Sequence, residues 1–160
     1  MKRIAVLISG GGSNLQSIID ATRQHKINAE IAVVISNKAE AFGLTRARQA
    51  NINTEVLDHH DYPTREAFDQ VLVDRLESYQ PDLIVLAGFM RILTPVFVDA
   101  FHGRTMNIHP SLLPAYPGLH THKRAIDAGD HRAGATVHFV TRELDGGPHI
   151  IQASVPILPG

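Results

Sequence analysis

The sequence contains no cysteine, which excludes disulfide bonds and thiolate chemistry and fits a reducing compartment. It also lacks any apolar run approaching the length of a membrane-spanning helix. Lys2 and Arg3 lead into a short apolar run that ends in glycines, without the small-residue cleavage site of a signal peptide. We therefore expect a cytoplasmic protein with no membrane partner.

Clustered basic residues are absent as well. The formal net charge is −1, and no stretch of Lys and Arg gathers the positive charge needed to hold a nucleic-acid backbone. The ten histidines are scattered, with close pairs only at His59-His60 and at His120 and His122. Neither spacing puts two imidazoles on one helical face, so no metal site is expected. Small-molecule substrates are favoured, and the oligomeric state is left undetermined.

Short apolar segments alternate with helical patterns over the first hundred residues. Strands are expected at 4–9, 29–35, 54–57, 83–87, 104–109, 134–140 and 150–155, and helices at 13–22, 41–50, 64–79, 94–100 and 119–128. This alternation predicts an α/β fold with a doubly wound, mostly parallel sheet and helices on both faces. The last strands, joined by a turn at 145–148, are expected to include an antiparallel pair. A chain of 160 residues is long enough for one domain and too short for two comfortable ones.

The first predicted strand ends in a run of glycines, Gly10 to Gly12, followed by Ser13 and Asn14 at the start of a helix. Backbone amides and the helix dipole converge at such a position, which favours binding of a phosphate group. The spacing matches neither a dinucleotide fingerprint nor a nucleoside-triphosphate loop, so a phosphate monoester is the favoured ligand. The alternative is a glycine turn with no ligand.

The fifth predicted strand leads into a stretch stiffened by Pro110, Pro114 and Pro117. Asn107 and His109 lie two residues apart on that strand and therefore share one of its faces. A neutral amide donor and a titratable imidazole side by side are typical of a polar site at the carboxyl end of a strand. A rigid surface loop with an incidental histidine is the competing interpretation.

Asp145 is the carboxylate that we pair with His109, because it would keep the imidazole charged and oriented toward a developing oxyanion. An aspartate before Gly146-Gly147 is also a common turn former, and sequence distance alone does not bring the two together. With no cysteine and no serine nucleophile elbow, direct attack by a substrate amine on an acyl donor is the favoured chemistry. Arg91 is expected either to meet a carboxylate-bearing or planar ligand or to face solvent, and His138 to be a core or wall histidine rather than a catalyst.

Several motifs together resemble those of the folate-dependent formyltransferases. They are Ser9-Gly10-x-Gly12-Ser13-Asn14, Ser36-Asn37, Ala41-Phe42-Gly43-Leu44, Leu86 to Arg91, Asn107 to Leu113, Tyr116-Pro117-Gly118 and Glu143 to Gly147. The resemblance runs from Ile4 to Gly160 and is strongest to members that act in de novo purine biosynthesis. It implies a Rossmann-like fold and transfer of the formyl group of 10-formyltetrahydrofolate, as co-substrate, to the amine of 5-phosphoribosyl glycinamide.

The resemblance also implies roles for individual residues. The catalytic residues would be Asn107, His109 and Asp145. The substrate phosphate would be bound by Gly12, Ser13, Asn14, Leu15 and Gln16. The folate pocket would be lined by Arg65, Met90, Arg91, Ile92, Leu93, Asn107, Thr141, Arg142, Glu143, Leu144 and Asp145, and no metal is implied.

Two departures from the family pattern qualify these expectations. Gly11 stands where relatives carry Asn, which removes a side-chain donor and leaves the backbone of the loop. The chain is expected to be a single formyltransferase domain, residues 1–160, without the family's C-terminal segment. Three other activities remain open, namely hydrolysis of 10-formyltetrahydrofolate, formylation of methionyl-tRNA, and ligand binding without turnover.

Overall fold

The computed structural model describes residues 1–109, 123–124, 128, 132–142, 147 and 149–156, with 132–134, 149 and 151–156 described by their backbone alone. The chain forms two compact units, Met1–Thr105 (unit 1) and Met106–Gly160 (unit 2).

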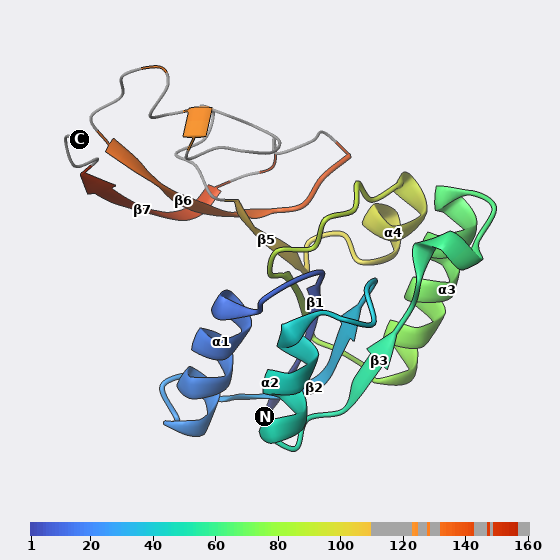
Figure 1. The fold of residues 1–160 in the computed structure, drawn as a ribbon, viewed down its shortest axis with the longest axis horizontal. Coiled ribbons are helices and arrows are strands. Elements are labelled where there is room, and N and C mark those ends of the chain that lie inside the picture. Colours follow the sequence, from blue (N-terminus) through green and yellow to red (C-terminus); the bar gives the residue numbers. More distant parts are fainter. Residues whose placement is uncertain (110–122, 125–127, 129–131, 143–146, 148, 157–160) are drawn as a thin grey trace. The chain divides into compact units, whose positions relative to one another are not determined.

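Unit 1 alternates strands with helices, as the sequence predicts (Figure 1). Its elements are β1 (Lys2–Ile8), α1 (Ser13–Arg23), β2 (Ala29–Ser36), α2 (Phe42–Gln49), β3 (Thr54–Val56), η1 (His59–Asp61), α3 (Arg65–Ser78), β4 (Leu83–Leu86) and α4 (Pro95–Ala100). The strands lie in the order β3-β2-β1-β4, and each neighbouring pair is parallel. The carboxyl ends of these strands therefore meet at one edge of the sheet, where ligands of α/β proteins bind.

Helices cover both faces of this sheet. Helices α1 and α2 pack against each other and against β2, whereas α3 packs against α4. Right-handed crossovers place α1 and α2 on one face and α3 on the other, because the chain reverses its direction across the sheet after β3. Most residues of β1, β2 and β4 are buried, which explains their largely apolar sequences.

Unit 2 contains the antiparallel pairing expected near the end of the chain. Strand β5 (Thr105–His109) starts at the last residue of unit 1 and pairs antiparallel with β6 (Arg132–Phe139), which pairs antiparallel with β7 (His149–Pro156). The register sets Asn107 opposite His138 and His109 opposite Thr136. Most of the helix expected at 119–128 lies outside the described residues, although Lys123 and Arg124 within it are helical.

The structure differs from the sequence-based expectations mainly at element boundaries. The segment expected to be a loop before α3 contains the 3-10 helix η1, where Asp58 accepts a hydrogen bond from the amide of His60. Helix α3 begins after Thr64, whose hydroxyl caps it, and its buried side chains include Asp69 and Val73. Among the described residues, no helix combines the length and apolarity required to span a bilayer.

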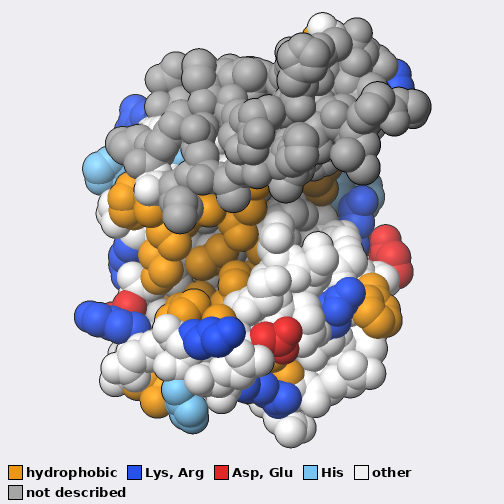
Figure 2. All heavy atoms as spheres, turned by 90° about the vertical axis from the view of Figure 1, so that its left-hand side faces the viewer, with side chains coloured by type: hydrophobic (Ala, Val, Ile, Leu, Met, Phe, Trp, Pro, Cys, Tyr) orange, Lys and Arg blue, Asp and Glu red, His pale blue; other side chains and the backbone are white. Residues whose placement is uncertain are grey.

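On the molecular face shown in Figure 2, Lys and Arg side chains lie among and beside Asp and Glu side chains. The described side chains on that face form no continuous basic stripe of the kind that holds a nucleic-acid backbone.

Candidate active site

The glycine loop between β1 and α1 places open backbone donors at a helix N-terminus. Gly12 precedes the helix with a left-handed φ of 77° that favours glycine, and its carbonyl accepts the first helical hydrogen bond from Gln16 N at 2.8 Å. No side chain caps this end, and the first turn of α1 carries no acidic residue. The amides of the first turn therefore remain available to an anion.

Contacts with α2 hold the loop in this conformation. The amide of Gly43 donates to Gly10 O at 3.0 Å, and Arg46 Nε donates to Gly11 O at 2.7 Å. In a trans peptide the N–H points opposite to the carbonyl, so the amides of Gly11 and Gly12 face away from α2. A methyl group on Gly12 would lie 2.7 Å from the Cα of Gly43, which explains the two glycines at this contact.

The predicted phosphate-binding residues occupy different environments in this loop. Ser13 and Asn14 are exposed, whereas Leu15 is fully buried and offers only its backbone amide. The amide of Gln16 is already used within the helix. Its side chain donates to Asp20 and accepts from Arg46, so Gln16 supports the loop more directly than it faces a ligand.

The loop after β4 combines exposed apolar side chains with one partly buried cation. Met90 and Ile92 are each 54% exposed. The Arg91 guanidinium lies 5.0 Å from the centre of the Phe68 ring, and its Nε is buried without a hydrogen-bond partner in the described part of the chain. An orphaned buried donor beside open apolar side chains fits a planar ligand that carries an acceptor group.

Arg65, the first residue of α3, is exposed in unit 1. Its side chain is therefore accessible to a ligand or to solvent.

In unit 2, Asn107 and His109 lie on the same face of β5, as the sequence predicts. His109 is buried, with 4% of its surface exposed. Asn107 Nδ2 lies 3.3 Å from His138 Nε2, and His138 Nδ1 lies 2.9 Å from the carbonyl oxygen of Phe139. The carbonyl can only accept, so His138 carries its proton on Nδ1 and Nε2 accepts from the amide of Asn107.

This contact gives His138 a role that the sequence did not indicate. It is buried, as expected, and it orients the Asn107 amide, which leaves a second N–H of Asn107 for another acceptor. The alternation of β6 indicated that His138 faces inward. Its partner depended on the register between β5 and β6.

The remaining predicted site residues follow β6, and only the first two of them are among the described residues. Thr141 and Arg142 are described, with Thr141 partly buried and Arg142 exposed. Glu143, Leu144 and Asp145 lie outside the described residues, and with them the predicted pairing of Asp145 with His109. Gly147 is buried, and a methyl group there would collide with the carbonyl of Phe139, so only glycine fits at that point.

Asp58, His59 and His60 bring three potential metal ligands within 4.8 Å of one another in η1. Hydrogen bonds explain why these three side chains lie close together without a metal ion. Asp58 Oδ1 accepts from His60 N at 2.9 Å and lies 3.0 Å from His60 Nδ1, while His59 Nδ1 faces Asn37 Nδ2 at 3.4 Å.

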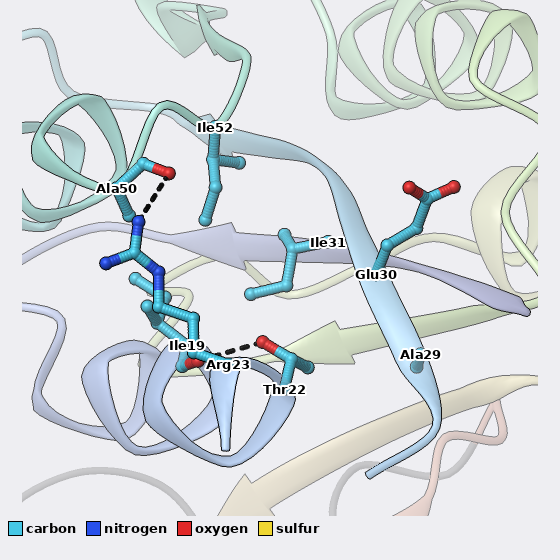
Figure 3. Close-up of a pocket in the computed structure, with 8 residues that line it drawn as sticks. All are labelled: Ile19, Thr22, Arg23, Ala29, Glu30, Ile31, Ala50 and Ile52. Atoms are coloured by element: carbon cyan, nitrogen blue, oxygen red, sulfur yellow. Dashed lines mark hydrogen bonds between the residues drawn. The ribbon is translucent and has the colours of Figure 1, made fainter. Parts of the chain in front are cut away.

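A pocket of about 230 Å³ lies between α1, the start of β2 and the segment after α2 (Figure 3). Arg23 crosses it and donates to the carbonyl of Ala50 at 2.9 Å. Ala29 to Ile31 begin β2, so the pocket lies at the amino end of that strand, whereas the glycine loop follows the carboxyl end of β1. None of the residues that line the pocket is a predicted binding residue.

Comparisons with known proteins agree over nearly the whole chain. Residues 2–160 match the formyl transferase family. The phosphoribosylglycinamide formyltransferase of Escherichia coli is 59% identical over 157 residues, which cover 98% of this chain and 74% of that protein. The Haemophilus influenzae protein of the same name is 56% identical over 159 residues, covering 99% of this chain and 75% of that one.

A solved structure, glycinamide ribonucleotide transformylase 1 from Symbiobacterium toebii, superposes with a TM-score of 0.97 at 51% identity. The match covers 99% of this chain and 75% of that one, which identifies the Rossmann-like formyltransferase fold. With its glycine loop, its paired Asn107 and His109 and this agreement in sequence and fold, the chain belongs to the formyl transferase family, as an enzyme that transfers formyl groups.

Proposed function

We propose that this protein transfers the formyl group of 10-formyltetrahydrofolate to the amine of 5-phosphoribosyl glycinamide in purine biosynthesis. The observation that carries the proposal is the placement of the Asn107 amide and the buried His109 imidazole on one face of β5. The two close relatives named for the same reaction, at 59% and 56% identity, support the choice of acceptor.

In the proposed reaction the substrate amine attacks the formyl carbon, and the formyl oxygen becomes negative. Protonated His109 and the free N–H of Asn107 hold that oxygen, because donors aimed at developing charge lower the barrier most. Asp145 keeps His109 charged. When the intermediate collapses, the bond from carbon to the donor nitrogen breaks, the former amine loses a proton and the leaving nitrogen gains one.

The phosphate of the glycinamide substrate binds at the glycine loop, to the amides of Gly12, Ser13, Asn14 and Leu15. Two observations support this assignment: the N-terminus of α1 has no side-chain cap, and hydrogen bonds from Gly43 and Arg46 hold the loop in place. Gln16 contributes by holding Arg46 at 3.3 Å.

The formyl donor lies against the loop Met90 to Leu93, between apolar side chains and the Arg91 guanidinium. The buried, unpartnered Nε of Arg91 supports this placement, since a carboxylate or carbonyl oxygen of the donor would satisfy it. Arg65 offers a second cation from the start of α3. We assign Thr141 to Asp145 to binding of the same co-substrate, as the resemblance to the family implies.

The test is to follow loss of the formyl group from 10-formyltetrahydrofolate with and without phosphoribosyl glycinamide. Loss only when the amine is present supports the transferase. Loss without the amine identifies a hydrolase, and binding with no loss identifies a ligand-binding protein, and either result overturns the proposal.

Variants then test the catalytic pair. His109→Ala and Asn107→Ala each remove an oxyanion donor, and we expect turnover to fall about a hundredfold or more. The exposed histidine His102, replaced by Ala, is the matched control and is expected to retain full activity. Full activity in His109→Ala would contradict the mechanism.

A further inference from the structure

A chain of hydrogen bonds joins the carboxyl ends of all four strands of unit 1. The amide of Met90, after β4, donates to Ser9 Oγ at 2.8 Å, and Ser9 Oγ, after β1, donates to Asn37 Oδ1 at 2.5 Å. Asn37 Nδ2, after β2, faces His59 Nδ1, after β3, at 3.4 Å. Ser9 and Asn37 are 5% and 2% exposed, so water cannot replace these partners.

The order of donors and acceptors along this chain follows from its Met90 end. Met90 N–H can only donate, so Ser9 Oγ accepts from it and directs its own proton to the carbonyl oxygen of Asn37. The amide group of Asn37 then points its N–H toward His59. His59 must therefore present an unprotonated Nδ1, and its ring proton is on Nε2.

We infer that Asn37 and His59 are positioning residues that hold the Met90 to Leu93 loop in place, and that they do so only while His59 Nδ1 is free to accept a hydrogen bond. This inference rests on the proposed function where it assigns that loop to the formyl-donor pocket. It assigns no contact with the reacting atoms to either residue.

Protonation of His59 reverses the chain of hydrogen bonds. Nδ1–H can only donate, so the Asn37 amide must turn its oxygen toward His59 and its N–H toward Ser9. Ser9 Oγ then receives two donors, and its own proton loses its partner at a buried position. Chains of hydrogen bonds that run in one direction strengthen each member, so this reversal weakens the hold on Met90 N–H.

The charges around His59 favour the unprotonated ring. Burial of the ring, the neighbouring His60 and Arg91, and more weakly Lys38, lower the pKa of His59, while Asp58 raises it. The ring is therefore neutral near neutral pH. The pKa of His59 is lower in the folded protein than in the unfolded chain. Acidification from the unfolded-chain pKa down through the folded-state pKa therefore lowers folding stability and disrupts the contact with Asn37.

The direct test is a pH titration of the full chain followed by NMR, observing the His59 ring and the backbone amide of Met90. In the wild-type protein the Met90 signal is expected to shift with the same midpoint as His59. In His59→Gln, whose side-chain oxygen accepts from Asn37 at every pH, that shift should vanish. His60→Gln, in the same turn and 78% exposed at its side chain, should retain it.

A Met90 amide that ignores the titration of His59, or that titrates equally in His59→Gln, would overturn the inference. This measurement uses no substrate, so it stands even if the proposed acceptor or donor is wrong.

Steady-state kinetics at neutral pH and at increasingly acidic pH test the consequence for function. His59→Ala and Asn37→Ala are expected to raise the KM for 10-formyltetrahydrofolate about three- to tenfold, the effect of one lost hydrogen bond, with kcat within about twofold. His59→Gln should restore the wild-type KM at neutral pH and remove its rise toward acid. An unchanged KM in His59→Ala, or an equal loss in His59→Gln, would refute the positioning role.

Discussion

At the residue scale, Asp69 is a buried carboxylate that joins two helices of unit 1. It lies in α3 with 1% of its surface exposed, and its Oδ2 accepts from both the amide and the hydroxyl of Thr94 at 2.7 Å each. Thr94 precedes α4, so this contact fixes where α4 begins. Burial raises the pKa of Asp69, while the two bonds from Thr94 and the nearby Arg91 charge oppose that effect.

Replacement of Asp69 by Ala is expected to lower the free energy of unfolding by roughly 2 to 4 kcal/mol, because two buried donors of Thr94 lose their acceptor. Urea denaturation measures the change. Asp74→Ala, in the same helix but exposed and hydrogen-bonded to the Gln70 side chain, is the matched control and should cost less than about 0.5 kcal/mol. A loss in Asp69→Ala no larger than in the control would contradict this account.

At the element scale, the glycine loop and the first turn of α2 form one closely packed contact. The backbone amide of Gly43 donates a hydrogen bond to Gly10 O, and a methyl group added to Gly43 would collide with Ile8 and lie 3.2 Å from Gly10 O. Ile8 is fully buried, so it has little room to move. The position of α2 thus determines which way the loop amides point.

We expect Gly43→Ala to destabilise the protein by about 1 to 3 kcal/mol through overpacking. The same change should raise the KM for the phosphate-bearing substrate about tenfold or more, because loop amides that bind a charged group are displaced. Thermal unfolding and steady-state kinetics measure the two effects.

Gly10→Ala provides the matched comparison in the same loop. A methyl group at Gly10 meets no atom within 4 Å, so stability should change by less than about 0.5 kcal/mol. Equal destabilisation by both substitutions would show that the contact with α2 is not what restricts Gly43.

At the scale of the whole molecule, the most deeply buried part of unit 1 is its parallel sheet. Strand β1 lies between β2 and β4, and Ala5 to Ile8 have no exposed surface. Strand β3 is short, lies at the edge of the sheet and is only partly buried. Local opening should therefore begin at β3 well before it reaches β1.

Hydrogen–deuterium exchange tests this order. The amides of β1 are expected to exchange only through global unfolding, whereas those of β3 should exchange faster by about tenfold or more. Denaturant should accelerate exchange in β1 strongly and in β3 weakly. Equal protection of the two strands would mean that unit 1 opens only as a whole.

Much of the fold could be predicted from the sequence because the signals involved are local. Apolar runs such as Leu83 to Ala87 indicated buried parallel strands, and Thr64 indicated the start of α3, which its hydroxyl caps at 3.1 Å. The helical periodicity of α3 was less informative. Asp69 faces the interior because Thr94 is there to satisfy it, and no local pattern contains that partner.

The sequence by itself determined the order of strands and helices, the glycine loop before α1, and the presence of Asn107 and His109 on one face of β5. Only the tertiary structure decided that His138 orients Asn107 and that Met90, Ser9, Asn37 and His59 form one hydrogen-bonded chain. Side-chain periodicity depends on neighbours a few residues away. These partners lie up to 81 residues apart, and strand register and packing bring them together.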